Sequence, residues 1–208
     1  METLTLNNYV ISWGIFWMTY WTVGSTISAY THFYGIRKIF SLRKVVFTVF
    51  YNMFWSLLAV ISLYIIPIQS HFLTNVHILI KMFGIYICTE LWFYHCHIMI
   101  HHPQLYVKIH KLHHYKEMNE PYALTALYCS PYETMFLNVV ATSIGPILFR
   151  PPPILLYLWF ILVAVNSLLA HSGLNIPYIF ESYHDVHHSD YSKHYGLTTY
   201  LDWIYGTL

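Results

Sequence analysis

Hydrophobic residues occur along this chain in long uninterrupted runs rather than in short alternating segments. The runs cover residues 9–34, 45–68, 78–100, 131–150 and 153–170. The length of each run is close to or above the roughly 20 residues that an α-helix needs to cross the hydrocarbon core of a bilayer. The pattern therefore predicts an all-α integral membrane protein.

Proline and glycine interrupt the last two runs. Gly145-Pro146 lies inside the fourth run, and the triplet Pro151-Pro152-Pro153 separates it from the fifth. Because these residues kink or end helices, the two runs form either a full transmembrane hairpin or two shorter helices that turn within the membrane. In both cases the chain returns to the side that it left. We expect about four transmembrane helices, arranged as two hairpins.

The composition agrees with a membrane protein. Hydrophobic residues make up 57% of the chain and charged residues 9%, with a mean hydropathy of +0.46, whereas a soluble domain has roughly 25% charged residues. Cys88, Cys96 and Cys129 form no spaced pair, so the sequence supports neither a disulfide framework nor a thiolate metal site. With no long linker or repeat array in the sequence, residues 1–208 are expected to form a single membrane domain.

Basic residues set the expected orientation. Arg37, Lys38, Arg43 and Lys44 crowd the loop after the first run, and cytoplasmic loops are the ones enriched in lysine and arginine. Counting crossings from that loop places the ends of the third and fifth runs on the same side. The histidine-rich segments that follow these runs are therefore expected to face the cytoplasm.

Histidine is concentrated in the second half of the chain, where 12 of the 15 histidines lie between residues 95 and 194. The pattern His-x-x-His-His should arise by chance roughly 0.08 times at this histidine content, and it occurs twice. The spaced sets are His97-x3-His101, His110-x2-His113-His114 and His184-x2-His187-His188, with His171 alone between the second and third.

The spacing within these sets is typical of metal ligands. Residues three and four apart share one face of a helix, so we expect the imidazoles of each set to converge on one side of their helix. Nine imidazoles are too many for one ion and suit two. Imidazole binds iron, copper, zinc and nickel, and a structural zinc site would be closed by four ligands. Two redox-active ions that share a pocket therefore fit the nine histidines best.

Two carboxylates are candidates for supporting these ligands. Glu90 precedes His97 by about two helical turns on the same face, and Asp185 lies inside the third set. A carboxylate in such a place can accept a hydrogen bond from the second nitrogen of an imidazole and orient the ring.

Two other classes of membrane protein bind metals through histidine. A haem-binding bundle would need histidines on facing helices near the middle of the membrane, but these sets lie at predicted helix ends. A metal transporter would place ligands along a path through the bilayer, and the predicted spans contain few ionisable residues. A non-catalytic membrane protein that binds or transports metal is kept as the alternative from a different class.

The histidine sets also carry a resemblance to a known family. Residues 90–114, ELWFYHCHIMIHHPQLYVKIHKLHH, resemble the core of the fatty acid hydroxylase and sterol desaturase superfamily of membrane di-iron enzymes. Segments 121–133, 171–177, 184–188 and 202–207 follow in the order of that family. The HSG-x-N-x-P segment is most similar to the branch of the C-4 methylsterol oxidases and cholesterol 25-hydroxylase. On this resemblance we divide the domain into two N-terminal transmembrane helices, residues 1–76, and a hydroxylase-like catalytic core, residues 77–208.

The resemblance implies a non-haem di-iron oxygenase, with two iron ions per chain held by the nine histidines and replaceable by zinc in purified samples. It implies O2 and an electron donor such as cytochrome b5 or an NAD(P)H-dependent reductase. The implied substrate is a lipid from the bilayer, preferably a sterol, and the alternatives are a fatty acid or sphingolipid hydroxylase and a sterol desaturase with the same site. The implied location is the endoplasmic reticulum, and no nucleic-acid partner is expected.

The chain departs from the family pattern at two positions near the histidines. Ile98 stands where the family usually has arginine, and His194 stands where an asparagine commonly precedes Tyr-Gly. The second departure makes His194 a candidate additional ligand or hydrogen-bond donor to the site.

Overall fold

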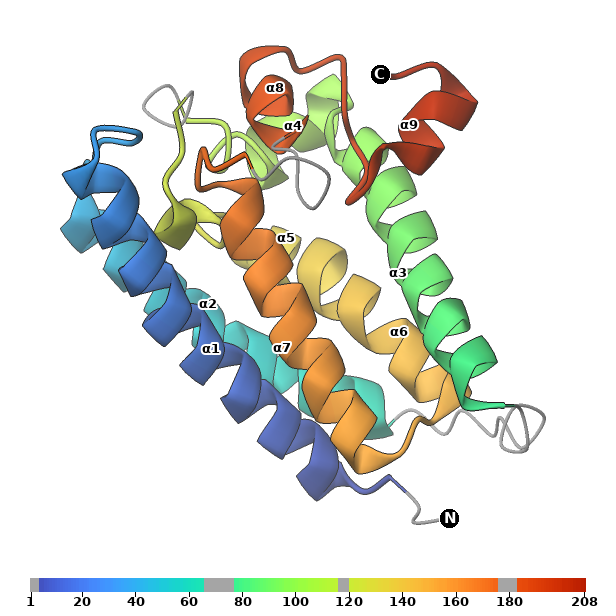
Figure 1. Ribbon diagram of the computed structural model, residues 1–208. Helices are drawn as coiled ribbons and strands as arrows, with labels where there is room; N and C mark the ends of the chain where they lie inside the picture. Colours follow the sequence, from blue (N-terminus) through green and yellow to red (C-terminus); the bar gives the residue numbers. More distant parts are fainter. Residues whose placement is uncertain (1–3, 66–76, 116–119, 176–182) are drawn as a thin grey trace.

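The computed structural model describes residues 4–65, 77–115, 120–175 and 183–208, and all regular secondary structure in these ranges is helical (Figure 1). The predicted all-α class is thus confirmed. The elements are α1 (Leu6–Phe33), α2 (Leu42–Ile65), α3 (Ile78–Ile100), α4 (Pro103–Ile109), η3 (Ala123–Thr125), α5 (Pro131–Glu133), η4 (Thr134–Val139), α6 (Val140–Phe149), α7 (Pro153–Ala170), α8 (Tyr183–Ser189) and α9 (Thr199–Tyr205).

Three of the described helices are long and apolar enough to cross a membrane. They are α2, the continuous helix of α5, η4 and α6 (Pro131–Phe149), and α7, with mean hydropathies of 1.8, 1.2 and 2.1. The fourth and fifth apolar runs thus form two helices of 19 and 18 residues, as expected for a full hairpin. Helices α1 and α3 have the necessary length but more polar residues, and the count of about four spans stays a prediction.

The helices bury polar residues and expose apolar ones, which is the reverse of a soluble bundle. The buried face of α1 includes Ser12, Ser28 and Thr31, whereas Phe47 on α2 and Phe83 on α3 are 74% and 65% exposed. Large apolar surfaces are stable where lipid replaces water, and small polar residues let membrane helices pack closely. This distribution supports an integral membrane protein.

The long helices bring all the histidine sets to one end of the bundle. Helix α7 packs along α1, α6 packs along α3, and α4, α8, α9 and the loop after α1 lie together at the end opposite the N-terminus (Figure 1). The common end was expected from counting crossings. That this end faces the cytoplasm stays a prediction.

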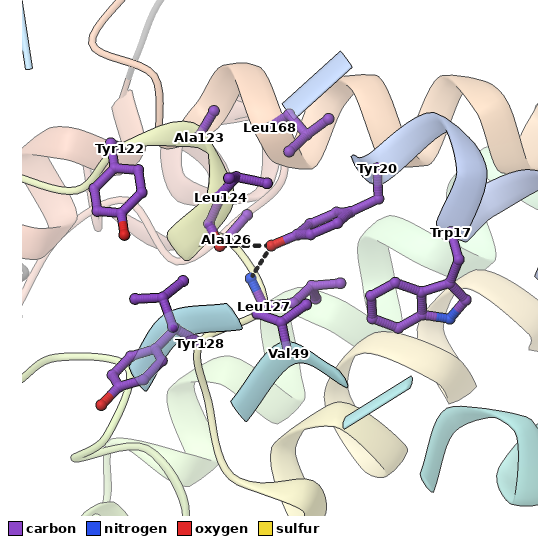
Figure 2. Packing of buried hydrophobic residues seen from close by; sticks show 11 residues of the cluster. Trp17, Tyr20, Val49, Tyr122, Ala123, Leu124, Ala126, Leu127, Tyr128 and Leu168 are labelled. Carbon is purple, nitrogen blue, oxygen red and sulfur yellow. Dashed lines mark hydrogen bonds between the residues drawn. The ribbon is translucent and has the colours of Figure 1, made fainter. Parts of the chain in front are cut away.

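An irregular buried segment, residues 121–130, lies beneath the histidine end and is held by the N-terminal helices. The Tyr20 hydroxyl donates to the oxygen of Leu124 at 2.7 Å and accepts from the nitrogen of Leu127 at 3.4 Å (Figure 2). The Asn52 amide donates to the oxygens of Leu127 and Cys129 at 3.0 and 2.8 Å. Because buried main-chain groups need hydrogen-bond partners, these two side chains permit an irregular segment inside the bundle.

Helices α3 and α6 approach so closely that only glycine fits between them. A Cβ atom built on Gly145 would lie 2.7 Å from the Cα of Ile85. The neighbouring atom belongs to the main chain, so the clash could be relieved only by moving the helices apart. This contact sets the short distance between α6 and α3 at Gly145 and Ile85.

We predict that Gly145→Ala destabilises the protein, because the added methyl group pushes α6 away from α3. The expected loss is about 1–3 kcal/mol in the free energy of unfolding, as for overpacked cores. Gly14→Ala is the matched control, since a Cβ there meets nothing within 4 Å and alanine favours a helix. Thermal unfolding in detergent measures both variants, and equal melting temperatures would contradict the proposed contact.

Candidate metal centre

The eight histidines of the spaced sets come together with His171 as two adjacent groups. Within each group, the nitrogen atoms that could bind a metal lie within 4.8 Å of one another. The first group is His97, His101, His110, His114 and His187, and the second is His113, His171, His184 and His188. Their role as ligands stays a prediction, but the sequence-selected histidines converge in space.

Each His-x-x-His-His triplet is divided between the two groups. His110 and His114 belong to the first group and His113 to the second, whereas His184 and His188 belong to the second and His187 to the first. Our expectation that all three imidazoles of a triplet converge was therefore wrong. In α8, at 100° per residue, positions four apart differ by about 40°, but the middle histidine lies about 100° from the last one. It therefore points to the other group. Residues 110–114 lie in a turn after α4, in which the nitrogens of His113 and His114 both donate to the oxygen of His110.

The spacing of the ring nitrogens fits a metal ion in each group. An ion that binds imidazole at about 2.1 Å places ligand nitrogens about 3.4 Å apart in tetrahedral geometry, and about 3.0 Å (neighbouring) or about 4.2 Å (opposite) apart in octahedral geometry. The Nε2 atoms approach to such distances in five pairs: His97–His110, His101–His187 and His114–His187 at 3.1 Å, His113–His171 at 3.3 Å and His113–His184 at 3.5 Å.

Main-chain carbonyl groups fix the tautomer of three of the nine rings. A carbonyl oxygen only accepts hydrogen bonds, so the Nδ1 atom that faces it carries the hydrogen and Nε2 carries a free lone pair. The pairs are His97 with Tyr195 at 2.7 Å, His187 with Lys193 at 2.6 Å and His171 with Ser167 at 3.0 Å.

The surroundings of His187 show that the first group fits a cation. Its Nε2 atom has one lone pair, yet it faces the Nε2 atoms of both His101 and His114 at 3.1 Å. One lone pair accepts one hydrogen bond, so hydrogen bonds alone cannot satisfy this arrangement. In the second group, both ring nitrogens of His188 are buried without a hydrogen-bond partner in the described part of the chain. A metal ion in each group would bind these nitrogens.

Burial keeps the imidazoles neutral. It lowers the pKa of His101 and His171 to about 4 and that of His187 to about 3. The pKa values of His110, His113, His114, His184 and His188 are lowered further by burial and then by the neighbouring imidazoles. Neutral imidazole is the form that binds metals. At pH 7 the histidines are therefore ready to bind a metal ion without first losing a proton.

Glu133 supports the first group and was not assigned a role from the sequence. Its Oε2 atom lies 3.0 Å from Nδ1 of His110, and both side chains are almost fully buried. The two atoms are close, but their alignment is not that of a hydrogen bond. Ser130 caps this helix by accepting from the Glu133 nitrogen at 3.1 Å. The Ser-Pro-Tyr-Glu sequence indicates such a cap, but it does not show that the carboxylate faces a histidine.

Asp202 holds the loop that orients His97. The carboxylate accepts from the nitrogens of Tyr195 and Gly196 at 2.8 and 3.0 Å and from the hydroxyl of Thr207 at 2.7 Å. The oxygen of Tyr195 in turn accepts from His97. The C-terminal segment thereby fixes the direction of an imidazole on α3.

Glu90 does not orient an imidazole, which corrects the role considered for it. Its Oε1 atom accepts from the nitrogen and the hydroxyl of Thr198 at 3.3 and 3.0 Å. Two turns separate Glu90 from His97 along α3, so the carboxylate lies below the histidines and ties the loop before α9 to the bundle.

Asp185 forms an ion pair with Arg37 from the loop after α1, and its expected role in orienting an imidazole stays a prediction. The guanidinium group lies against Gly173, where a Cβ atom would be 2.5 Å from the Arg37 Cζ atom and φ is +72°. Glycine is therefore needed at this position for two reasons, space and conformation. The pair connects the N-terminal hairpin to α8, which carries His184 and His188.

His194 belongs to neither group. Its ring stacks on Tyr183 at 5.3 Å, and its main chain is left-handed with φ 53°. Asparagine adopts this conformation more readily than histidine. His194 lines a cavity beside the groups, and its role as an additional ligand or donor stays a prediction.

A cavity of about 130 Å³ extends from the histidines into the bundle. It touches His97 and His110 of the first group and His113, His171 and His184 of the second. Apolar side chains of α1, α2, α3, η4, α6 and α7 form most of the remaining wall surface, among them Phe16, Val60, Phe93, Leu137 and Phe160. Both groups therefore face one narrow space that is open to an apolar molecule.

Comparison with known proteins identifies the same region. A family model described as fatty acid hydroxylase matches residues 82–207. Human fatty acid hydroxylase domain-containing protein 2 is 33% identical over 119 residues, which cover 57% of this chain and 35% of that protein. Methylsterol monooxygenase 2-2 of Arabidopsis thaliana is 35% identical over 135 residues, 59% of this chain and 50% of that protein.

A third relative is the fatty acid hydroxylase ahd1 of Mycosarcoma maydis, 36% identical over 119 residues that cover 57% of this chain and 30% of that protein. The chain thus spans between about a third and a half of the length of these relatives. No solved structure matches the chain.

We predict that Glu133→Ala weakens metal binding by about 10- to 100-fold, as expected when the group that supports a ligand is lost. Glu133→Gln keeps an oxygen near His110 and should weaken binding less. Competition of the purified protein with a metal chelator measures both. Equal affinities of Glu133→Ala and the wild type would show that the carboxylate does not support His110.

We further predict that Arg37→Gln and Asp185→Asn each lower the metal content per chain, because either change releases α8 from the N-terminal hairpin. The double variant should lose no more than either single variant, since both remove the same ion pair. Arg43→Gln is the matched control, because Arg43 is an exposed cation of the same region. Metal analysis of purified protein gives the result, and additive losses would argue against a shared role.

Proposed function

Because the chain belongs to the fatty acid hydroxylase family, we propose that it is a membrane non-haem di-iron oxygenase that oxidises a C–H bond of a lipid. The observation that carries the proposal is the pair of histidine groups, five and four imidazoles, at one end of an apolar cavity. A single structural ion would not need nine imidazoles.

The iron ions would be held by His97, His101, His110, His114 and His187 in the first group and by His113, His171, His184 and His188 in the second. When bound, they supply the redox chemistry by which one oxygen atom of O2 enters the C–H bond and the other leaves as water, with two electrons and two protons from a donor. Imidazole also binds zinc, so zinc is a plausible replacement in purified samples.

The protein supplies positioning and a dry site. The carbonyl groups of Tyr195, Lys193 and Ser167 hold three imidazoles with Nε2 toward the groups. The buried segment 121–130 closes the site from the side of the N-terminal helices. Excluding water protects a reactive centre from side reactions, and the apolar lining of the cavity admits a lipid segment from the bundle interior.

The substrate that we prefer is a sterol, because several relatives are named methylsterol monooxygenase. A fatty acid or sphingolipid would use the same site, and relatives named fatty acid hydroxylase support that choice. Hydroxylation, desaturation and stepwise oxidation share the same metal site and differ in how the substrate lies in the cavity.

The remaining features of the proposal concern the partners and the location. Electrons would come from cytochrome b5 or an NAD(P)H-dependent reductase, which reach the histidine end from the cytoplasm. The basic loop after α1 lies at that end (Figure 1), and basic loops favour the cytoplasmic side. The endoplasmic reticulum is the proposed membrane.

A non-catalytic metal-binding or transport protein is the alternative function. It predicts labile zinc in the purified protein and no lipid product, whereas the oxygenase predicts two irons per chain and an O2-dependent product. A Soret band in the absorption spectrum would instead indicate haem.

We predict that sterol-producing cells expressing the wild-type chain accumulate a lipid heavier by one oxygen atom, or the acid derived from it, and that His187→Ala abolishes it. His187 contacts two other imidazoles of the first group, so its loss opens that group. His95→Ala is the matched control, because His95 lies on α3 but outside both groups. Mass spectrometry of extracted lipids measures the product. Full activity of His187→Ala would contradict the oxygenase.

A further inference from the structure

Hydroxyl groups in the wall of the cavity mostly donate hydrogen bonds to carbonyl oxygens of their own helix or of a neighbouring helix. Thr89 donates to the oxygen of Ala141 at 2.9 Å, and Thr142 donates to the oxygen of Asn138 at 2.8 Å. Hydrogen bonds of a side chain to its own or a neighbouring helix satisfy the hydroxyl within the membrane. These groups have no free donor for a molecule in the cavity.

Ser143 on α6 differs from these residues. It lines the cavity and is only 2% exposed, yet its hydroxyl has no hydrogen-bond partner in the part of the chain that the structure describes. Leaving a buried hydroxyl unsatisfied is unfavourable. A polar group on a molecule inside the cavity would satisfy it.

Ser143 lies far below the histidines. The residue two positions before it contacts Thr89 on α3, and the residue two positions after it packs on Ile85. Thr89 and Ile85 precede His97 on the same helix by distances of about 12 and 18 Å, at about 1.5 Å per residue. Ser143 is therefore about 12–18 Å from the histidine groups along the bundle axis.

The charges in the cavity wall indicate a neutral partner for this hydroxyl. Among the described residues that line the cavity there is no lysine or arginine, and its carboxylates are those of Glu133 and Asp202. Both carboxylates belong to the histidine end, where they contact His110 and the nitrogen of Tyr195. An ionised head group would have no counter-charge beside Ser143, and burying one without a partner is costly.

We propose that Ser143 hydrogen-bonds a neutral polar group, a hydroxyl or a carbonyl, at one end of the lipid substrate. This inference rests on the proposed oxygenase function. The carbon that is oxidised then lies about 12–18 Å from the polar group, at the opposite end of the molecule. The substrate class is an uncharged lipid with its polar group at one end and an alkyl segment at the other, and a long-chain alcohol and a sterol both have this form.

Asn166 on α7 provides the competing arrangement. It also lines the cavity, but it precedes His171 by only about 7.5 Å along its helix. If Asn166 bound the polar group of the substrate, the oxidised carbon would lie near that polar group. The position of the new oxygen atom on the product therefore distinguishes Ser143 from Asn166 as the anchor.

The test uses membranes from cells expressing the full chain, supplied with NADPH and O2. The probes are a sterol and a long-chain fatty alcohol, each beside its counterpart without the hydroxyl group. We expect the new oxygen atom at the end remote from the hydroxyl. Ser143→Ala should lower kcat/KM roughly tenfold for the hydroxylated probe, the usual effect of one lost hydrogen bond. For the counterpart without the hydroxyl group, the variant and the wild type should have the same kcat/KM.

Ser62→Ala is the matched control, because Ser62 on α2 does not line the cavity and its hydroxyl is already bonded to the oxygen of Leu58 on its own helix. It should leave kcat/KM unchanged for every probe. The proposal is overturned if Ser143→Ala lowers turnover equally with and without the substrate hydroxyl, if it has no effect, or if oxidation occurs beside the polar group and Asn166→Ala abolishes that preference. Absence of any product from the wild type would instead overturn the oxygenase function itself.

Discussion

The structure depends on the convergence of imidazole lone pairs in a space from which water is excluded. Nine neutral rings point their nitrogens at two small volumes, and some of these nitrogens have no acceptable hydrogen-bonding arrangement among themselves. The surroundings must hold each ring in place, and a metal ion bound by the facing lone pairs would stabilise the arrangement further. The main-chain carbonyl groups beside His97, His171 and His187 and the carboxylate of Glu133 provide the first of these conditions.

The N-terminal hairpin of α1 and α2, which precedes the region matched by the family model, has a structural part in this site. Tyr20 and Asn52 satisfy the main chain of segment 121–130, which closes the site from one side. Arg37 reaches α8 through Asp185. A core that began after α2 would lack these three contacts. They favour the single domain expected from the sequence, which stays a prediction.

Much of this architecture could be predicted from local patterns in the sequence. The apolar runs and the repeated His-x-x-His-His spacing report on single helices, and the helices and the histidine end follow from them. The division of each triplet between two groups, the contact of Glu133 with His110 and the pairing of Glu90 with Thr198 depend on how elements distant in sequence meet. Periodicity along one helix carries no information about those contacts, which is why spacing did not predict the partner of Glu90 or the place of Glu133.

The division of the triplets ties the two groups together mechanically. The turn from His110 to His114 and helix α8 each present imidazoles to both groups. An ion bound in one group would also immobilise the 110–114 turn and α8, which carry ligands of the other group. The conformational entropy lost on ordering these two segments would then not have to be lost again when the second ion binds. The two sites should therefore fill and empty cooperatively, so that chains with both ions and chains with none predominate over chains with one.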